Sequence, residues 1–555
     1  MAVLDIFRQN KKDDEQDPVV SSIPQLPIRQ LIDGERRSYL LKLYSHLRGT
    51  QHAHKRYDWD GRMLFGYDDS LDIPVDTYVP MKRRRPCISL RMGKVITKRF
   101  TTMVFGHDRF PSIVVDGDPD AEDYIREMAK AAKLRTKMVE ARDKGGACGS
   151  VIISWGFADG RPVIDVHLSA LVEVLEWQDY ENRIPSKVFK AYDFRRKVYK
   201  PDGKPETKTF WCVRYWDTEV DRLWEAIPDE HAATPQWQLW PSTTIVHGHG
   251  SCPVVWVQNI ADSDDIDGIC DADGQHEDFD EMDRLASATE RGTVANVDPT
   301  LVVKDKKRKD ETVVRKGSGS VIYAPGGANY LELQGTAVEA AKSLLQSIKQ
   351  SELDEAEVVL LDPEKLSGSG VSAASLKVRY APMLAKCDLL RDQYAEAIVS
   401  VLKTMIETAR KLQGDVKTTD EGMRYWSKID LDPRVETSEE TNEEGEEIKT
   451  TVEVERTPGS SNRISLRWPP YFPATWEDRK TAIESLSKAT GNQQIVSQKT
   501  AVETLSPMMD IEDPEAEIER INEDQDGKDE RAKNLFDVGA PASVEDPVED
   551  PSDDQ

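Results

Sequence analysis

The sequence predicts an α+β protein that is built from several structural units. At 555 residues, the chain is longer than one typical domain. Several segments repeat apolar residues every three or four positions, which predicts helices with one buried face. Other segments alternate apolar and polar residues, which predicts half-buried strands. Both patterns occur between residues 100 and 260, which we expect to form a mixed α+β domain.

The N-terminal part begins with residues 1–30, where prolines among polar residues predict a mobile arm. Helices are expected over 30–48, 87–104 and 121–143. Gly106 is a suitable stop for the second of them. Strands are expected at 110–116, 145–157, 161–177, 186–194, 207–217 and 242–249. The tryptophans of this region are expected in its core: Trp211, Trp216, Trp224, Trp237 and Trp240.

From residue 262 the pattern becomes mainly helical. The expected elements are a carboxylate-rich helix at 262–296, short strands with turns at 299–333, a helix at 335–353, a Gly/Ser-rich loop at 362–370 and a long helix at 372–412. Pro382 lies inside the long helix. Proline removes a backbone donor and clashes with the preceding turn, so we expect a kink there.

The C-terminal part is expected to return to strands before it ends in helices. Strands are expected at 424–433 and 463–474, on either side of a Glu-rich insert at 436–455 that would form an exposed hairpin or a mobile loop. Helices are expected at 476–489, 497–504 and 514–523. From about Gly527 the acidic, proline-containing sequence predicts a disordered tail.

Charge is distributed in blocks along the chain. The formal net charge is −27. Residues 81–110 nevertheless carry nine Lys or Arg against Asp108, whereas residues 261–290 carry twelve Asp or Glu against Arg284. Segments of opposite sign predict surfaces that face different partners.

Several classes of protein are not indicated. No apolar run of 18 residues occurs and the N-terminal segment lacks the order of a signal peptide, so we expect a soluble, unexported chain with no membrane partner. The six cysteines include no CxxC pair, which favours a reducing compartment. The chain also lacks a P-loop, a GxSxG elbow and an HExxH motif, so it offers no machinery for nucleotide hydrolysis.

Two clusters contain suitable metal ligands. His247 and His249 would share one strand face, with Cys252 nearby, but no second close pair completes a zinc site and a Gly-rich turn is the favoured interpretation. The acidic cluster lacks the ligand order of an EF-hand, and a carboxylate-rich helix start is favoured. Its members are Asp262, Asp264, Asp265, Asp267, Asp271 and Asp273. We therefore expect neither a metal nor a cofactor.

Two basic runs have the charge to contact phosphates. The first continues from residues 82–85 into Arg91, Lys94 and Lys98, which share one helix face. In so acidic a chain, pairing of this face with acidic neighbours is the favoured interpretation. The second run, at 304–309, lies in a turn-rich stretch where it would be exposed to DNA or to an acidic partner.

Four phrases, in this order, resemble segments of tailed-bacteriophage portal proteins of the SPP type. CPVVWVQNIADSDDIDG (252–268) resembles the start of the stem, and RLASATERGTVANVDPTLVV (284–303) resembles the passage from the stem to the clip. LSGSGVSAASLKVRY (366–380) resembles the tunnel loop and the start of the spine helix. IVSQKTAVETLSPMMDIEDPEAEIERINED (495–524) resembles the crown. Each phrase alone is weakly specific, but four in the right order are strong, and the resemblance covers roughly residues 85–525.

The resemblance implies a portal fold, with a mixed wing domain, a two-helix stem, a small α/β clip, a long kinked spine helix and a helical crown. The implied parts are an N-terminal arm (1–30), the wing (31–260 and 415–475), stem helix 1 (261–296), the clip (297–334), stem helix 2 (335–358), the tunnel loop (359–371), the long kinked helix (372–414), the crown (476–526) and an acidic tail (527–555).

The resemblance also implies function and partners. Twelve copies would form a ring at one capsid vertex of the virion, with double-stranded DNA passing along its axis and no enzymatic role. The terminase large-subunit ATPase and later the head–tail connector would dock on the clip, while the wing would contact the major capsid protein and scaffold. The tunnel loop would face DNA through Lys365, Ser367, Gly368, Ser369 and Gly370. The clip would present Lys304, Lys306, Lys307, Arg308 and Lys309 to terminase or connector.

Two other functions remain open at this point. The acidic cluster would suit a metal-dependent head-processing enzyme or nuclease if two or three carboxylates converged on a metal pair. Residues 81–110 would suit a monomeric DNA-binding assembly protein. In the portal interpretation, a carboxylate-rich stem repeated around a narrow tunnel would repel the phosphate backbone and let DNA slide.

Overall fold

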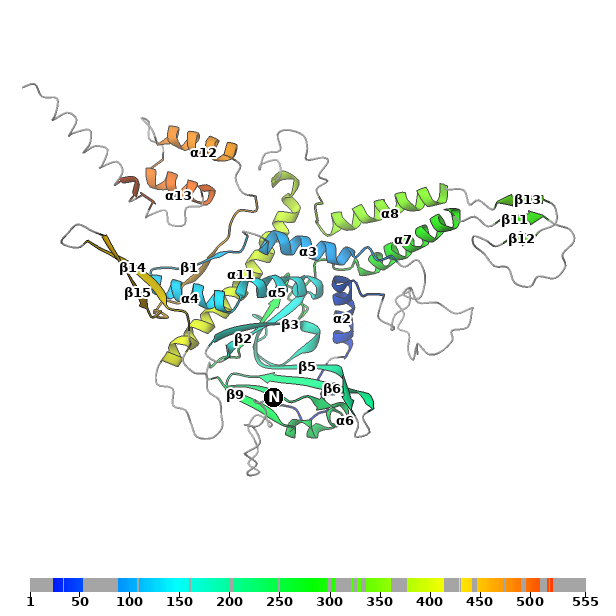
Figure 1. Ribbon diagram of the computed structural model, residues 1–555, viewed down its shortest axis with the longest axis horizontal. Helices are drawn as coiled ribbons and strands as arrows, with labels where there is room; N and C mark the ends of the chain where they lie inside the picture. The colour runs from blue at the N-terminus through cyan, green and yellow to red at the C-terminus, as the bar shows by residue number, and fades with distance from the viewer. Residues whose placement is uncertain are drawn as a thin grey trace, which may run out of the picture. The chain divides into compact units, whose positions relative to one another are not determined.

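The computed structural model divides the chain into two compact units. The first comprises Met1–Leu360 and Tyr380–Trp468, and the second comprises Leu361–Arg379 and Pro469–Gln555. Helices and mainly antiparallel sheets occur together, which confirms the α+β class (Figure 1). The structure describes residues 23–32, 34–52, 88–106, 109–158, 161–199, 204–247, 250–297, 301–304, 321–323, 327–330, 336–360, 377–413, 429, 431–441, 447–472, 476–490, 496–509, 517–518 and 520–522. Over these residues, no helix is both long and apolar enough to cross a bilayer.

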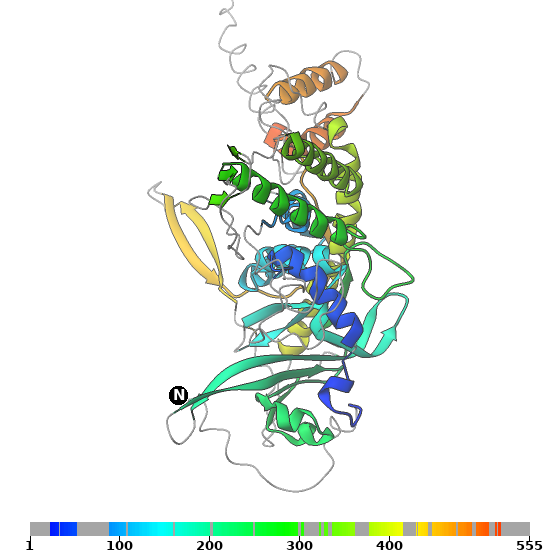
Figure 2. The ribbon, with the colours of Figure 1, turned by 90° about the vertical axis from the view of Figure 1, so that its right-hand side faces the viewer.

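A six-stranded antiparallel sheet is the largest sheet of the first unit. Its order is β4-β5-β6-β7-β9, with β8 paired to β6. Its strands are β4 (Val172–Asp179), β5 (Ile184–Tyr199), β6 (Pro205–Trp216), β7 (Val220–Trp224), β8 (Ile227–Pro228) and β9 (Ser242–Val246). β5 pairs with β6 out to Tyr199 opposite Pro205, beyond the ends of the other strands. The outer part of this pair is therefore a two-stranded ribbon (Figure 2).

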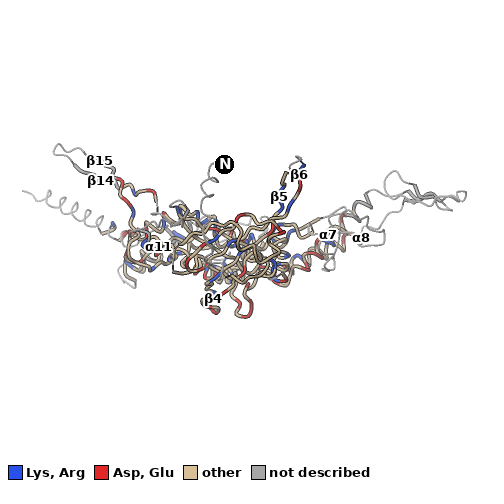
Figure 3. The backbone as a smooth tube through the Cα atoms, turned by 90° about the horizontal axis from the view of Figure 1, so that it is seen from below, with Lys and Arg blue, Asp and Glu red and all other residues tan. Residues whose placement is uncertain are grey.

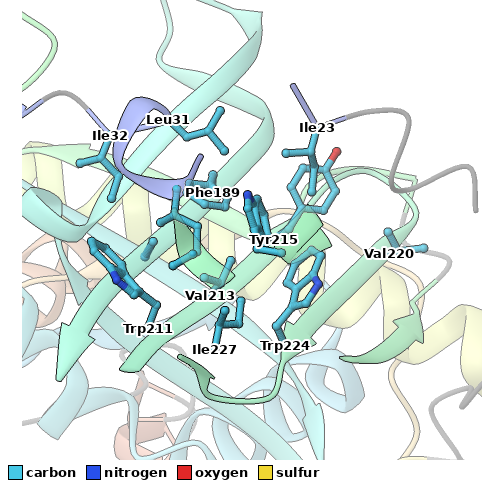
Figure 4. Packing of buried hydrophobic residues seen from close by; sticks show 14 residues of the cluster. Ile23, Leu31, Ile32, Phe189, Trp211, Val213, Tyr215, Val220, Trp224 and Ile227 are labelled. Carbon is cyan, nitrogen blue, oxygen red and sulfur yellow. The ribbon is translucent and has the colours of Figure 1, made fainter. Parts of the chain in front are cut away.

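An aromatic core covers one face of this sheet (Figure 4). Its largest members are Phe189, Trp211, Tyr215, Trp224 and Trp237. The short helices α6 (Asp229–Ala232) and η4 (Pro235–Leu239) close over them. Trp216 is buried in a neighbouring cluster and Trp240 packs, partly buried, against the aromatic core, so the predicted core role of the tryptophans is confirmed.

The expected N-terminal arm is wrong over residues 23–30. Ile23 and Ile28 are buried in the aromatic core, and η1 (Ile28–Gln30) follows Pro27 as a single 3-10 turn. Two carbonyls of this segment accept hydrogen bonds from the core: the Trp237 indole donates to Leu26 at 2.9 Å and the Gln238 amide donates to Pro24 at 2.9 Å. The prolines therefore hold this segment in an extended conformation against the core. Each proline fixes its own backbone angle and has no N–H group that would need a partner in a neighbouring strand.

Four helices accompany a second, three-stranded sheet of order β10-β2-β3. The elements are α2 (Gly34–Arg48), α3 (Met92–Phe105), α4 (Pro119–Ala131), α5 (Leu134–Cys148), β2 (Ser150–Ala158), β3 (Arg161–Leu168) and β10 (Val254–Gln258), and the 3-10 turn η3 (Ser169–Leu171) links β3 to β4. α5 packs on β2 and β3, and α2 and α3 pack on α5. A separate two-stranded sheet pairs β1 (Ser112–Val115) with β16 (Ile464–Arg467).

The helix expected at 121–143 is two helices in the structure. Lys133 adopts a left-handed backbone with φ of 54°, which ends α4 and starts α5 in a new direction. α5 then continues to Cys148, so the strand expected from residue 145 begins only at Ser150. Arg91, with φ of 55°, similarly delays the start of α3 to Met92. Non-glycine residues rarely take this conformation, so the sequence pattern did not indicate these breaks.

The helix expected at 262–296 starts only at His276. Residues 261–275 form an ordered loop that leads into α7 (His276–Val297). Gly268 and Gly274 have φ of 69° and 75°, and the Asp262 carboxylate accepts a hydrogen bond from the Asp264 amide at 2.9 Å. Such local carboxylate–backbone bonds compete with helix formation. The carboxylates are therefore loop residues and do not form a charged helix start.

α7 and α8 (Thr336–Glu355) run side by side and are joined through a small sheet (Figure 1). The sheet has the order β12-β11-β13, with β11 (Leu301–Lys304), β12 (Val321–Tyr323) and β13 (Gly327–Tyr330). β11 is parallel to β12 and antiparallel to β13. The helix–strand–helix order that the sequence predicts here is confirmed.

α11 (Ala381–Gln413) is the longest helix of the described chain. Its buried side chains keep the predicted three- and four-residue spacing: Met383, Cys387, Leu390, Tyr394, Ile398, Val401 and Met405. Lys377–Arg379 are helical, Tyr380 is a turn, and α11 begins after it, so Pro382 is the second residue of α11. In the first turn of a helix, proline loses no intrahelical hydrogen bond.

The Glu-rich insert forms an antiparallel hairpin of β14 (Arg434–Thr441) and β15 (Glu447–Val454). This agrees with the hairpin alternative for that segment. The second unit contains α12 (Trp476–Ala489) and α13 (Gln498–Met509), which pack on each other. The helices expected at 476–489 and 497–504 are confirmed, and α13 extends further than expected.

Candidate functional site

The candidate site is the polar junction at which the loop 259–275 meets α5, α8 and α11. We select it because the α7–α8 hairpin starts and ends there. The described chain also stops at Leu360, five residues after α8, and resumes at Lys377, four residues before α11.

A fully buried ion pair lies at its centre. Arg142 of α5 donates to both carboxylate oxygens of Asp271, at 2.8 and 3.0 Å, and neither side chain is exposed to solvent. Asn259 donates to the same carboxylate at 3.1 Å, and the Tyr394 hydroxyl of α11 donates to Asn259 at 3.3 Å. Burial opposes the charge on Arg142, but the adjacent Asp271 raises the pKa of the guanidinium, so Arg142 stays charged.

Two glycines of α5 make room for this network. A Cβ on Gly146 would lie 2.1 Å from the Arg142 guanidinium and 2.2 Å from the Asp271 carboxylate. A Cβ on Gly145 would lie 2.2 Å from the Tyr394 hydroxyl. The Asp271 amide donates to the Gly146 carbonyl at 2.8 Å, which holds the loop against the helix. Only glycine permits this approach of the loop and the helix.

Replacing Gly146 with alanine is expected to destabilise the first unit by about 1–3 kcal/mol, because the new Cβ has to displace a locked ion pair. Gly292 of α7 is the matched control. A Cβ there would meet only Val338, at 3.7 Å, so alanine is expected to stabilise its helix by up to about 1 kcal/mol. Thermal unfolding of both variants measures the difference, and equal effects would contradict the packing described.

A second arginine anchors the first half of the loop. Arg36 of α2 donates to both Asp267 oxygens at 2.7 Å, and the Ser150 hydroxyl donates to the same carboxylate at 2.5 Å. Arg183, which is 8% exposed, donates to the carbonyls of Asp262, Ser263 and Asp265. The loop is thus fixed by Arg36 of α2 and by Arg183 of the turn between β4 and β5, which explains why it is ordered despite its charge.

The end of α8 is fixed in the same junction. Glu357 has φ of 60°, its amide donates to Asp354, and the Val358 amide donates to Leu353 at 2.8 Å. This is a Schellman stop, in which Val358 and Leu353 are both buried. The Gln275 side chain donates to the Glu352 carbonyl at 3.0 Å, so the start of α7 and the end of α8 are tied together.

Lys386 connects α11 to the loop 259–275 and to the end of α8. Its ammonium lies 3.3 Å from the Asp271 carbonyl and 3.4 Å from the Ala356 carbonyl, and 4.9 Å from the centre of the Phe100 ring. One side chain therefore bridges the loop, the end of α8 and the first turns of α11. Both flanks of the segment 361–376 are held at this point.

Further along α7, Asp283 ties the hairpin to the start of α3. Its carboxylate accepts hydrogen bonds from the Leu90 amide at 2.7 Å and the Gln51 side chain at 3.0 Å, and lies 2.8 Å from the His52 ring. Asp283 itself is 1% exposed. This buried carboxylate, with Asp267 and Asp271, faces protein and not a channel, so the expectation of an acidic DNA-repelling surface does not hold for these three residues.

The residues that the sequence singled out are placed only in part. Lys365, Ser367, Gly368, Ser369 and Gly370 lie outside the described residues, as do Lys306, Lys307, Arg308 and Lys309. Lys304 is the last residue of β11, with its backbone opposite Gly327. Their contacts with DNA or partner proteins, like the kink at Pro382, stay predictions.

The described residues do not support a metal site. No group of three His, Cys, Asp or Glu side chains among them is arranged to hold a metal ion. His247 is buried with its Nε2 3.0 Å from the Asp217 carbonyl, and Cys252 lies in an apolar cluster. His249 is outside the described part. Asp267 and Asp271 of the acidic cluster are bound to arginines, so they do not converge on a metal pair.

The basic face of α3 is partly neutralised within the chain. Lys98 forms an ion pair with Asp143 of α5 at 2.5 Å, and the Thr101 hydroxyl donates to the other oxygen of that carboxylate. This contact supports the favoured interpretation of the face, in which acidic neighbours balance its charge.

One buried constellation superficially suits nucleophilic catalysis. The Ser154 hydroxyl lies 2.6 Å from His167 Nε2, and the Lys190 ammonium lies 2.9 Å from His167 Nδ1. A lysine can only donate, so Nδ1 accepts and Nε2 carries the proton. Nε2 then donates to Ser154 and cannot take its proton, which is the reverse of a catalytic serine–histidine pair. The contact is structural.

His167 predicts how stability depends on pH. Burial, with Lys190 nearby, lowers the pKa of His167 to about 2, below its unfolded value of 6.5. The fold therefore favours the neutral ring, and this contribution is present above pH 6.5 and lost as the pH falls below it. Between pH 7 and 5 the loss is about 2 kcal/mol. In thermal unfolding over this range, the melting temperature of His167→Gln should fall less steeply with pH than that of the unmodified protein. An equal slope would show that His167 does not cause the pH dependence.

The buried arginine junction was not predicted from sequence. The available signal was the pair Gly145–Gly146 at the end of a helical pattern, which predicts close packing of another segment against the helix. The alternation of residues 145–157 predicts instead that these glycines begin a strand. The partners of Arg142 and Arg36 lie more than 100 residues away, at Asp271 and Asp267, and no local pattern pairs them.

Comparison with known proteins gives one family match. Residues 31–531 match the family model described as "Phage portal protein, SPP1 Gp6-like". The matched range begins just before α2 and extends past α13, so it spans the junction, the α7–α8 hairpin and both units. No curated protein sequence matches the chain.

Proposed function

The chain belongs to the SPP1 Gp6-like family of phage portal proteins, and we propose that its α7–α8 hairpin and α11 line the channel that these proteins form. Portal proteins assemble as a ring at one vertex of the capsid, and the genome passes through the ring during packaging and ejection. The protein is therefore a structural, non-enzymatic component of the virion.

We assign the parts of the portal fold to the described elements. α7 and α8 are the stem, the sheet β11–β13 is the clip, α11 is the spine helix, and the second unit holds the crown. The six-stranded sheet and the sheet β10-β2-β3 belong to the wing. The single observation that supports this assignment best is the order of a helical hairpin joined through a small sheet and followed by a long helix, with the segment 361–376 between.

Within this assignment, the tunnel loop at 359–371 reaches the DNA, and Lys365 is the residue expected to meet phosphate. The clip, with Lys304, Lys306, Lys307, Arg308 and Lys309, receives the terminase ATPase and later the connector. The wing faces the major capsid protein and the scaffold. The arginine junction holds stem, loop and spine together, so that movement of one is transmitted to the others.

We propose twelve copies in the ring. The mass of one chain is 62.7 kDa, so native mass spectrometry of the purified protein should give a closed assembly of about 750 kDa. A closed assembly with a different number of chains would change only the proposed copy number. A monomer or an open series of sizes would instead contradict ring formation.

A further inference from the structure

The outer part of the β5–β6 pair is a basic ribbon, which we define as residues 194–199 and 204–209. Lys and Arg outnumber Asp and Glu there by five to one, in a chain whose net charge is −27. Figure 3 shows Lys and Arg positions in blue along β5. The five cations of the ribbon are all exposed: Arg195, Arg196, Lys197, Lys204 and Lys208.

The charge of the basic ribbon is poorly neutralised within the chain. Among the residues that the structure describes, Arg195, Arg196 and Lys197 form no ion pair. Arg196 lies directly opposite Lys208, and like charges at opposed positions destabilise a strand pair. Lys208 reaches Glu230 at 3.9 Å, but a contact between such exposed groups contributes little. The ribbon therefore carries an electrostatic cost that a bound polyanion would remove.

One face of the basic ribbon presents hydrogen-bond donors and no carboxylate. Side chains alternate along a strand, so Arg195, Lys197 and Tyr199 of β5 share this face. Their partners across the pair are Thr209, Thr207 and Pro205. Guanidinium and ammonium groups only donate, and hydroxyl groups donate as well. Glu206, the one carboxylate of the ribbon, pairs with Val198 and therefore belongs to the other face.

This face suits the phosphate backbone of DNA better than a protein partner. Stable protein interfaces have an apolar centre, whereas Tyr199, which is 71% exposed, is the only large exposed apolar side chain of the ribbon. Protein–DNA interfaces are more polar and much more positively charged. A two-stranded β-ribbon also fits the width of the major groove of a duplex.

The root of the basic ribbon is fixed to the first unit. Phe194 stacks on Phe210 across the pair, with ring centroids 6.0 Å apart. One residue further in, the Asp193 carboxylate accepts a hydrogen bond from Arg37 of α2 at 3.2 Å, and Trp211 opposite it is buried. The cations beyond this root are thus held on a fixed support and are open to a ligand.

We propose that the basic ribbon binds the phosphate backbone of double-stranded DNA, without reading its sequence. This is a second DNA contact, separate from the proposed tunnel loop at 359–371. Because the ribbon belongs to the six-stranded sheet, the contact lies outside the channel. That location rests on the assignment of this sheet to the wing in the proposed function.

The test measures binding of the full-length protein to a covalently closed circular DNA duplex, which cannot be threaded through a closed ring. The ribbon variant carries Arg195→Gln, Arg196→Gln and Lys197→Gln. Its affinity for the circle at moderate salt should be lower by about tenfold or more. The slope of log affinity against log salt should also become shallower by about 2–3, because each lost phosphate contact removes about 0.9 from it.

The matched control neutralises three exposed basic residues elsewhere on the first unit: Lys130→Gln, Lys133→Gln and Arg135→Gln. It changes the net charge by the same amount and should leave affinity and salt slope unchanged. A charge-conserving variant, Arg195→Lys with Arg196→Lys, should keep the slope of the unmodified protein. This comparison separates loss of phosphate contacts from damage to the fold.

The proposal is overturned if the unmodified protein does not bind the circle, if the ribbon variant binds it equally well, or if the control weakens binding as much. Normal binding of the circle together with lost ring assembly would assign the ribbon to an acidic protein surface instead of DNA. Absence of rings in the unmodified protein would refute the proposed function, and the same titration would still decide whether the ribbon binds DNA.

Discussion

Replacing Asp271 with alanine is expected to destabilise the first unit by about 3–5 kcal/mol, because it leaves the Arg142 guanidinium buried without its counter-ion. The loss is large because both side chains are fully buried, so water cannot replace the missing carboxylate. Asn259 would also lose one of the two acceptors of its amide, and would keep the Ile269 carbonyl. Thermal unfolding should show a lower melting temperature for the transition of the first unit.

Two further variants make this result specific. Arg284→Ala removes an exposed pair with Glu281 on α7, and it should cost at most about 1 kcal/mol. Combining Asp271→Ala with Arg142→Met removes both charges and should recover part of the stability, since an apolar pair has no unmatched charge. A loss as small as that of Arg284→Ala would show that the pair is hydrated in solution. It would then not hold the hairpin.

Deleting Lys365–Gly370 is expected to leave ring assembly intact and to abolish most DNA packaging. The physical reason is that the deletion removes the proposed DNA-facing loop, whereas the arginine junction on both of its flanks stays complete. Ten residues of the segment 361–376 remain to connect α8 with α11. Packaging is measured as DNA protected from nuclease inside filled heads, and assembly is measured as the mass of the purified ring.

A deletion of equal length in the acidic tail, Glu545–Asp550, serves as the control and should package normally. The single variant Lys365→Ala should show a smaller packaging loss than the deletion. If the deletion prevents ring formation, the segment is part of an interface between copies and its assignment as the tunnel loop is wrong. If packaging continues at the normal rate, DNA is not contacted there.

Elements whose burial follows a regular period could be predicted from the sequence. α11 buries residues at three- and four-residue steps, and β6 alternates buried and half-buried residues from Trp211 to Tyr215, so the spacing of apolar residues alone indicates both elements. The family resemblance then placed these elements in one architecture. The hairpin α7–α8 with its small sheet was likewise predictable, because turn residues separate its helical patterns.

Features that depend on distant partners could not be predicted. The loop 261–275 reads as a helix start until Arg36 and Arg142 are seen to bind its carboxylates. Residues 23–30 read as an arm because their apolar side chains are few, yet Ile23 and Ile28 complete a core formed 200 residues later. The breaks at Arg91 and Lys133 occur at residue types that normally continue a helix.

The most direct test of the central claim is electron microscopy of the purified full-length protein. If the chain is a channel subunit, particles seen along their axis should be closed rings with a central hole wide enough for a DNA duplex. Averaged maps should then place the α7–α8 hairpins around that hole. Closed particles without a hole, or monomers at micromolar concentration, would contradict the account.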